Sequence, residues 1–174
     1  MGLSIAISGG IVTFSIVYAM MSFSTVVDDS TKISTSQSQM SNNLFSRLQT
    51  NISISSLQDY NDTNPATFKI TNTGNTALWN YNNFDVIITY QETGINGPIV
   101  TEVLKYANSC SGLATGQWCI SQIQNDNIHP GMLDPGEIAT INAQPTHITE
   151  INGIFTAEFG TDNGVTTSSS VRIS

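Results

Sequence analysis

The sequence predicts an N-terminal hydrophobic α-helix followed by an all-β domain of the immunoglobulin-like sandwich class. Three observations lead to this prediction. No residue before Asp28 has a charged side chain, although the chain has thirteen acidic and five basic residues in all. From Asn51 onward, short runs of alternating apolar and polar residues are separated by turn residues. Charged residues make up only 10% of the 174, against about 25% in a typical soluble protein, which favours an extracellular surface.

The first predicted element is a transmembrane helix in residues 1–27. Leu3 to Val27 carry no charge, and a helix of that length covers about 38 Å, enough for a hydrocarbon core of about 30 Å. No Lys or Arg precedes this segment, as a cleaved secretory signal would require, so we expect a retained anchor. A buried helix of a soluble core, the alternative, would need an apolar shell that the polar remainder does not provide. We therefore expect a single-span protein of the cell membrane with its C-terminal domain outside the cell.

One face of this helix carries small residues. Ser4, Ser8, Ser15 and Ser22 fall within about 40° of one another at about 100° per residue. Such a stripe lets a second helix approach closely, which predicts helix packing through these four serines. In the alternative interpretation, each hydroxyl bonds the carbonyl group four residues earlier in its own helix.

Residues 28–50 are predicted to continue outward as a polar helical stalk. The segment has no Gly or Pro, and the apolar residues Ile33, Met40, Leu44 and Leu48 recur at spacings of seven and four. Its many Ser and Thr residues weaken helix formation, so disorder over Ser34 to Ser41 is the alternative.

Residues 51–174 are predicted to form the β-sandwich. In ATFKIT, apolar Ala66, Phe68 and Ile70 alternate with polar residues, and FDVIITY repeats the pattern from Phe84 to Tyr90. Gly, Asn and Pro residues close both runs. The other predicted strands are Ile52–Ser56, Ile99–Tyr106, Gln117–Ser121, Glu137–Ile141, Gly153–Phe159 and Val165–Ile173. Eight strands in about 120 residues are typical of an immunoglobulin-like sandwich, and a β-barrel is the rival architecture.

The two cysteines, Cys110 and Cys119, lie nine positions apart with Gly112 and Gly116 between them. The glycines let the chain fold back, which predicts a local disulfide and an oxidising compartment. A zinc site would need about four ligands, and the chain has only two histidines to complete one. Two unpaired thiols are the alternative that the sequence leaves open.

The composition argues against several function classes. A net charge of −8 leaves few cations for phosphate groups, so we expect no binding of nucleic acid. No nucleophile, phosphate-loop or zinc-protease motif occurs, so neither enzymatic activity nor a cofactor is expected. Asp126, Asp134 and Glu137 surround a turn that could hold calcium, but we expect hydrated turn residues and predict no metal site. The sequons at Asn51 and Asn61 are candidate glycan acceptors.

Two stretches are candidates for a partner contact. In ALWNYNNFD, we expect Trp79 to be buried in the core and Tyr81 to be exposed to a partner. The terminal run VTTSSSVRI has a single charged residue, so little guards its edge against strand pairing. We therefore expect self-association, or binding of an envelope protein, through the run that contains Val165, Val171 and Ile173.

Four parts of the chain carry a resemblance to a known family: the opening MGLSIAISGGIVTFSIVYAMMSF, the polar stalk, FKITNTGNTALW and HPGMLDPGEIATI. Together they resemble the archaellum accessory proteins of the FlaF family, and less closely their sister family FlaG. The resemblance covers the layout of the whole chain, including the G-x-S-x-x-x-S pattern that starts at Gly2. It implies a membrane-anchored protein that works with other archaellum components. Its immunoglobulin-like domain would bind the S-layer, or another cell-envelope protein, and act as a stator for the rotating filament.

The same resemblance leaves a second role open. Archaellins and archaeal pilins share the helix-plus-sandwich plan, so the alternative is a dimer- or filament-forming subunit that packs its N-terminal helices into a core. The sequence shows no short basic leader ending in Gly ahead of the apolar segment, which we expect of a pilin precursor. This feature favours the stator.

Overall fold

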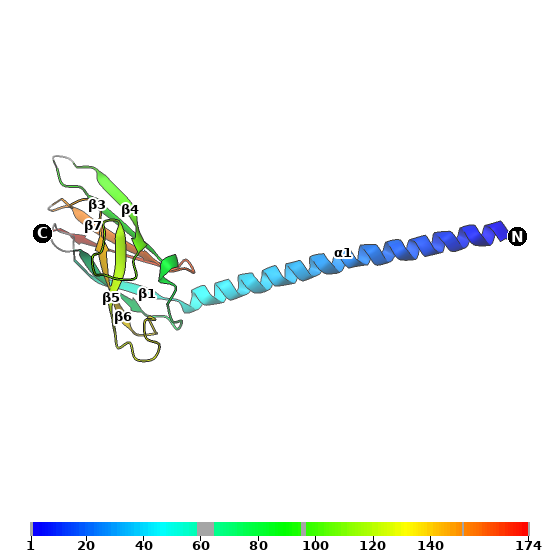
Figure 1. The fold of residues 1–174 in the computed structure, drawn as a ribbon, viewed down its shortest axis with the longest axis horizontal. Coiled ribbons are helices and arrows are strands. Elements are labelled where there is room, and N and C mark those ends of the chain that lie inside the picture. The colour runs from blue at the N-terminus through cyan, green and yellow to red at the C-terminus, as the bar shows by residue number, and fades with distance from the viewer. Residues whose placement is uncertain (1, 59–64, 95–96, 151, 174) are drawn as a thin grey trace. The chain divides into compact units, whose positions relative to one another are not determined.

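The computed structural model describes residues 2–58, 65–94, 97–150 and 152–173, and among these the side chains of all except residues 2–8, 23–26 and 28–30. The described residues form one long α-helix, one short 3-10 helix and eight β-strands (Figure 1). The chain divides into two compact units, Met1–Leu44 and Phe45–Ser174.

Helix α1 spans Gly2–Gln49. Thr13, Ser15 and Ser22 each donate a hydroxyl hydrogen bond of 2.9 Å to the carbonyl oxygen four residues earlier. Thr31 and Thr35 make the same bond in the second half of the helix. These bonds satisfy polar groups that would otherwise compete with the helix. Residues 34–41, for which disorder was the alternative, are helical.

The expectation of a membrane-spanning helix in residues 1–27 is not confirmed and stays a prediction. Among the residues that the structure describes, no helix combines the length and the apolarity needed to cross a bilayer.

The eight predicted strands are all present. They are β1 (Ile52–Gln58), β2 (Ala66–Asn72), β3 (Asp85–Gln91), β4 (Ile99–Tyr106), β5 (Gln117–Gln124), β6 (Ile138–Gln144), β7 (Ile154–Gly160) and β8 (Thr166–Arg172). Their order across the sheet is β1-β2-β6-β5-β4-β3-β7-β8. The neighbours are antiparallel except β4 and β5, which run parallel and pair only at Lys105–Gln117 and Tyr106–Trp118.

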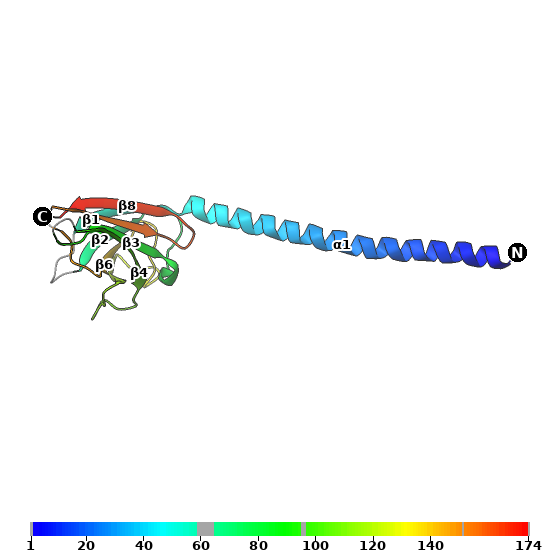
Figure 2. The ribbon, with the colours of Figure 1, turned by 90° about the horizontal axis from the view of Figure 1, so that it is seen from above.

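This short parallel pairing is a narrow seam between two four-stranded layers. One layer is β1-β2-β6-β5 and the other is β4-β3-β7-β8. Strands β1 and β8, at the two ends of the order, lie beside each other (Figure 2). The sheet is therefore nearly closed, and its architecture is intermediate between the predicted sandwich and the alternative barrel.

The inward faces of the two layers form one apolar core. Burial alternates residue by residue along β2 and β6, as the two-residue period of a strand requires. The ring centre of Trp118 lies 4.8 Å from that of Tyr106 and 5.8 Å from that of Phe159. Burying one large apolar side chain contributes about 1.5–3 kcal/mol. The described core begins at Ile52 and takes no residue from α1.

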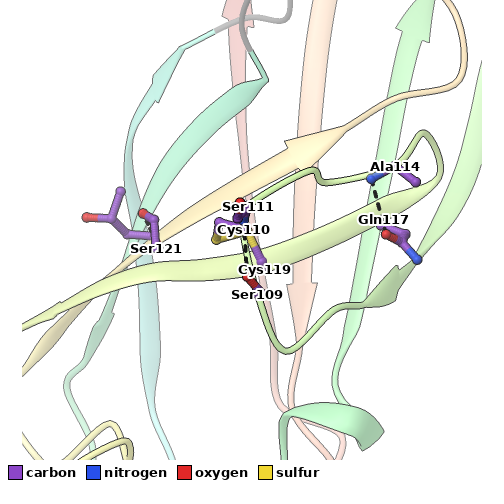
Figure 3. Close-up of a disulfide and its surroundings, with 8 residues drawn as sticks. Ser109, Cys110, Ser111, Ala114, Gln117, Cys119 and Ser121 are labelled. Atoms are coloured by element: carbon purple, nitrogen blue, oxygen red, sulfur yellow. Dashed lines mark hydrogen bonds between the residues drawn. A yellow bond between two sulfur atoms is a disulfide. The ribbon is translucent and has the colours of Figure 1, made fainter.

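A disulfide joins Cys110, in the β4–β5 connection, to Cys119 of β5 (Figure 3). The two Cα atoms are 5.5 Å apart. Gly112 and Gly116 have φ angles of 70° and 75°, a region that glycine adopts without steric cost. The predicted disulfide is therefore present, in a loop that reverses at its glycines.

Replacing both cysteines with alanine should lower the free energy of unfolding by about 2–3 kcal/mol, because the loop between them then expands freely in the unfolded chain. Urea denaturation of a Cys110→Ala/Cys119→Ala variant measures this change. The wild type under a reducing agent is the control and should lose a similar amount. An unchanged midpoint in both samples would contradict the prediction.

Tyr90 couples the stability of the β domain to alkaline pH. Its hydroxyl donates to Oε1 of Glu102 at 2.8 Å and accepts from the amide of His147 at 3.1 Å. Burial, followed by the hydrogen bond to Glu102, raises the pKa of Tyr90 to about 12. An unfolded tyrosine has a pKa of about 10. The stability that the neutral phenol contributes is therefore complete below about pH 10 and is lost as the pH rises through about 12.

The urea midpoint of the wild type should stay level up to about pH 10 and then fall steeply. Tyr90→Phe lacks this phenol and should show a shallower fall over the same range. Part of the fall should persist in that variant, because burial also raises the pKa of Tyr81. If the urea midpoints of the two proteins fall equally with pH above about pH 10, Tyr90 does not cause the loss of stability at alkaline pH.

Candidate assembly site

The first unit exposes a large apolar surface. Phe14 is 73% exposed, and its exposed apolar neighbours are Ile11, Val12, Ile16, Val17, Tyr18, Met20 and Met21. At about 100° per residue, these side chains occupy all sides of the helix. A helix that is apolar all round is normally buried. We call residues 11–21 the apolar belt.

The second half of α1 has a different pattern. Ile33, Met40 and Leu44 are exposed and fall within about 40° of one another. The residues between them are mostly Ser, Thr, Gln and Asn. We call Ile33, Met40 and Leu44 the outer stripe. It suits packing on one side of the helix, whereas the apolar belt suits packing on every side.

The predicted serine stripe is only partly described. Ser15 and Ser22 donate to the carbonyl oxygens of Ile11 and Tyr18 in their own helix, which matches the alternative interpretation. The side chains of Ser4 and Ser8 lie outside the described residues. Helix packing through the four serines stays a prediction.

In the second unit, the end of α1 meets the turn at residues 72–76, NTGNT. The amide of Asn75 donates to the carbonyl oxygen of Gln49 at 2.7 Å, and the amide of Thr73 donates to that of Asn51 at 2.9 Å. The first bond satisfies a carbonyl group that a helix end leaves open. Residue 74 is glycine because a Cβ there would lie 2.5 Å from the Gln49 oxygen.

The loop between β7 and β8 holds the same turn of the helix. Asn163 donates from Nδ2 to Oγ1 of Thr50 at 2.6 Å and to the hydroxyl of Ser46 at 3.3 Å. Its Oδ1 accepts from the hydroxyl of Thr161 at 2.6 Å, which fixes the orientation of the amide. The end of α1 is therefore held by loops from both layers of the sandwich.

The turn at residues 72–76 is itself fixed by Asn72, which is fully buried. Its Nδ2 donates to the carbonyl oxygens of Thr76 at 2.8 Å and Leu133 at 2.9 Å, and its Oδ1 accepts from the amide of Gly74 at 3.1 Å. The amide of Gly136 donates to the Asn72 carbonyl oxygen at 2.7 Å. The NTGNT and LDPGE motifs thus form one hydrogen-bonded unit.

Two of the acids in this region are buried, so the expectation of hydrated turn residues is wrong for them. Oε2 of Glu137 accepts from the amide of Asp134 at 2.9 Å, and the Asp134 carboxylate lies 3.1 Å from Nδ1 of His129. Asp126 accepts from the amide of Gly131 at 2.9 Å. In the part of the chain that the structure describes, no three His, Cys, Asp or Glu residues are placed to hold a metal ion.

The expectations for Trp79 and Tyr81 are both wrong. Trp79 is 62% exposed and Tyr81 is 7% exposed. Tyr81 begins the 3-10 helix η1 (Tyr81–Asn83), donates its hydroxyl to the carbonyl oxygen of Leu78 at 3.0 Å and packs edge-on against Phe84. Leu78 pairs with Leu133 in an isolated β-bridge and is buried. Because successive side chains of an extended segment point to opposite sides, Trp79 faces solvent.

The terminal run does lie at an edge, because β8 ends the strand order. Its three apolar residues nevertheless serve the core: Ile173 is buried in it, and Val165 and Val171 pack against it. Val165 and Val171 are only partly buried, and contact of this run with a partner through its strand edge stays a prediction. Asn51 is exposed, whereas Asn61 lies outside the described residues.

Comparisons with known proteins found likenesses of fold only. No model of a known protein family matches the chain, and no curated protein matches it. The archaeal flagellum of Methanospirillum hungatei strain JF1 aligns with a TM-score of 0.54 at 16% identity, over 97% of this chain and 93% of that chain. The alignment therefore includes both the helix and the β domain.

Two archaellum structures from Sulfolobus acidocaldarius also align. The periplasmic stator protein FlaG gives a TM-score of 0.48 at 20% identity, over 70% of this chain and 99% of that chain. The periplasmic stator protein complex of FlaF and FlaG gives 0.47 at 20% identity, over 69% of this chain and 87% of that chain. These comparisons do not single out FlaF.

Proposed function

We propose that this protein is a non-enzymatic, structural component of an archaellum and that it forms filaments by packing helix α1 against α1 of other copies. The observation that carries the proposal is the apolar belt, which is exposed on all sides of the helix in the single chain. The described core of the β domain takes no residue from α1. The belt is therefore available for contacts between copies.

The composition of α1 adds an energetic reason for such contacts. Each Ser or Thr lowers helix stability by about 0.5 kcal/mol relative to Ala, and isolated helices depend on packing for most of their stability. The segment after the apolar belt is rich in both residues. Burial of the apolar belt and the outer stripe against neighbouring helices offsets this weakness.

The change from an all-round to a one-sided apolar surface fits a particular arrangement. A helix in the middle of a bundle has neighbours on every side, whereas a helix near the bundle surface has them on one side only. In α1, the apolar belt comes first and the outer stripe follows it. The first part of the helix therefore suits the middle of a bundle, and the later part suits a place near the bundle surface. The fold likeness to the Methanospirillum hungatei flagellum, which extends over 97% of this chain, supports the same role.

The sequence alone favoured a membrane-anchored stator that binds the S-layer. In that role, lipid or other archaellum components would cover α1, and copies of the chain would not. The two roles therefore differ in what the purified protein does by itself. The filament role requires self-assembly, and the stator role does not.

Detergent removal from the purified full-length protein should yield long filaments of uniform width. Negative-stain electron microscopy and sedimentation measure this outcome. The same preparation kept in detergent is the control and should stay dispersed. Particles that remain monomers or dimers after detergent removal would contradict the filament proposal and favour the stator.

A further inference from the structure

We propose that Trp79 of one copy inserts into a hollow on the β domain of the next copy, so that the β domains are joined head to tail. The inference rests on the proposed function for the presence of many copies. The contact itself involves only residues of the second unit.

Trp79 is an exposed aromatic side chain whose neighbours in the sequence are held by hydrogen bonds. Its neighbour Leu78 exchanges two backbone hydrogen bonds with Leu133, of 3.0 Å and 2.8 Å. On the other side, Nδ2 of Asn80 donates to the carboxylate of Asp162 at 3.3 Å. Because the backbone here is already ordered, binding through Trp79 does not require the segment to be ordered first. Tryptophan is also among the residues that dominate interface energies.

The hollow has a volume of about 220 Å³. Its lining consists of Thr89, Tyr90, Gln91, Ile99, Ile154 and Thr156. Ile99 and Ile154 are 76% and 58% exposed, so a partner that fills the hollow would bury two large apolar side chains. An apolar cavity of about 150 Å³ holds a benzene molecule, so this hollow has room for an aromatic ring.

Trp79 and the hollow lie at opposite ends of the β domain. Trp79 precedes Asp85, the first residue of β3, and the hollow includes Gln91, the last residue of β3. A strand of this length spans about 20 Å. The two features therefore meet only between different copies. A contact between two different surfaces is heterologous, and its repetition gives an open helical array when the rotation does not close a ring.

The charge distribution favours this contact. Residues 51–174 carry eleven acidic and three basic residues, so the net charge of the domain is −8, and neighbouring domains repel. The segment ALWNY around Trp79 has no charge, and none of the six residues lining the hollow is charged. Two acids border these surfaces, and each already accepts a hydrogen bond there, Asp162 from Asn80 and Glu102 from Tyr90.

Photo-crosslinking of the full-length protein tests the contact directly. With p-benzoylphenylalanine in place of Trp79, ultraviolet light should join position 79 to peptides that contain Ile99 or Ile154. A mixture of isotope-labelled and unlabelled chains shows whether the crosslink joins two copies. The control places the same photo-reactive residue at Ile128, another exposed apolar position, and should give no crosslink to the hollow.

Substitutions provide a second readout. Trp79→Ala and Ile154→Glu should each raise the protein concentration needed for filament formation by on the order of tenfold. Ile128→Ala is the matched control and should leave it unchanged. The inference would be overturned if Trp79→Ala formed filaments at the same protein concentration as the wild type and position 79 gave no crosslink. The filament proposal would then still stand. Crosslinks to the hollow in small oligomers that never elongate would support the contact and contradict the filament.

Discussion

Phe14→Lys should abolish filament formation and leave the β domain folded. Phe14 lies in the apolar belt, and in a helix bundle its replacement would bury an unpaired charge in every subunit. Leaving a charge buried without its partner costs about 3–5 kcal/mol, which corresponds to more than about a hundredfold loss of affinity at each contact. Sedimentation after detergent removal measures the loss of filaments.

Thr35→Lys is the matched control for this substitution. Thr35 is exposed on α1 and lies about 160° away from Ile33 of the outer stripe. This variant adds the same charge to the same helix and should still form filaments. Thermal unfolding followed by circular dichroism should give the wild-type midpoint for the β domain of both variants. Filaments of Phe14→Lys at the wild-type concentration would contradict burial of the apolar belt.

Gly74→Ala should lower the free energy of unfolding of the β domain by about 2–4 kcal/mol, the sum of an overpacking cost and lost hydrogen bonds. The new Cβ would lie 2.5 Å from the Gln49 oxygen and also against the Asn51 nitrogen, so the turn must move. That movement weakens the bond from the Asn75 amide to Gln49. It also displaces the Gly74 amide from the side chain of Asn72.

Gly10→Ala is the control for this change, because a Cβ at Gly10 has no neighbouring atom within 4 Å. Its β domain should unfold at the wild-type urea concentration. Urea denaturation followed by tryptophan fluorescence compares the two variants, because unfolding exposes the buried Trp118. A Gly74→Ala protein with the wild-type midpoint would show that the turn at residues 72–76 adapts without cost.

The sequence predicted the strands well because each strand carries its own signal. Alternation of apolar and polar residues is local, and it placed the start of β1 at Ile52 and the whole of β4 as the structure has them. The disulfide was also predictable, since the two cysteines lie only nine positions apart with two glycines between them. Local pattern is enough where the burial of a residue depends only on the strand to which it belongs.

The candidate site was harder to predict because it depends on contacts between distant segments. Trp79 is exposed because Leu78 pairs with Leu133. The residues near Trp79 in the sequence do not indicate that Leu133 is the pairing partner. The bond between Asn163 and Thr50 joins residues separated by 113 positions. The aromatic segment ALWNYNNFD lies largely outside regular strands, so alternation could not show which ring faces inward.

The hydrogen bonds at the end of α1 have a mechanical consequence. The turn at residues 72–76 follows β2 in one layer, and the loop that contains Asn163 joins β7 to β8 in the other layer. A tensile load on the last turn of α1 is therefore divided between the two layers, so no single strand bears it alone. Single-molecule pulling on the helix should give a higher rupture force for the wild type than for Asn163→Ala, in which the load passes only to the layer that contains β1 and the turn at residues 72–76.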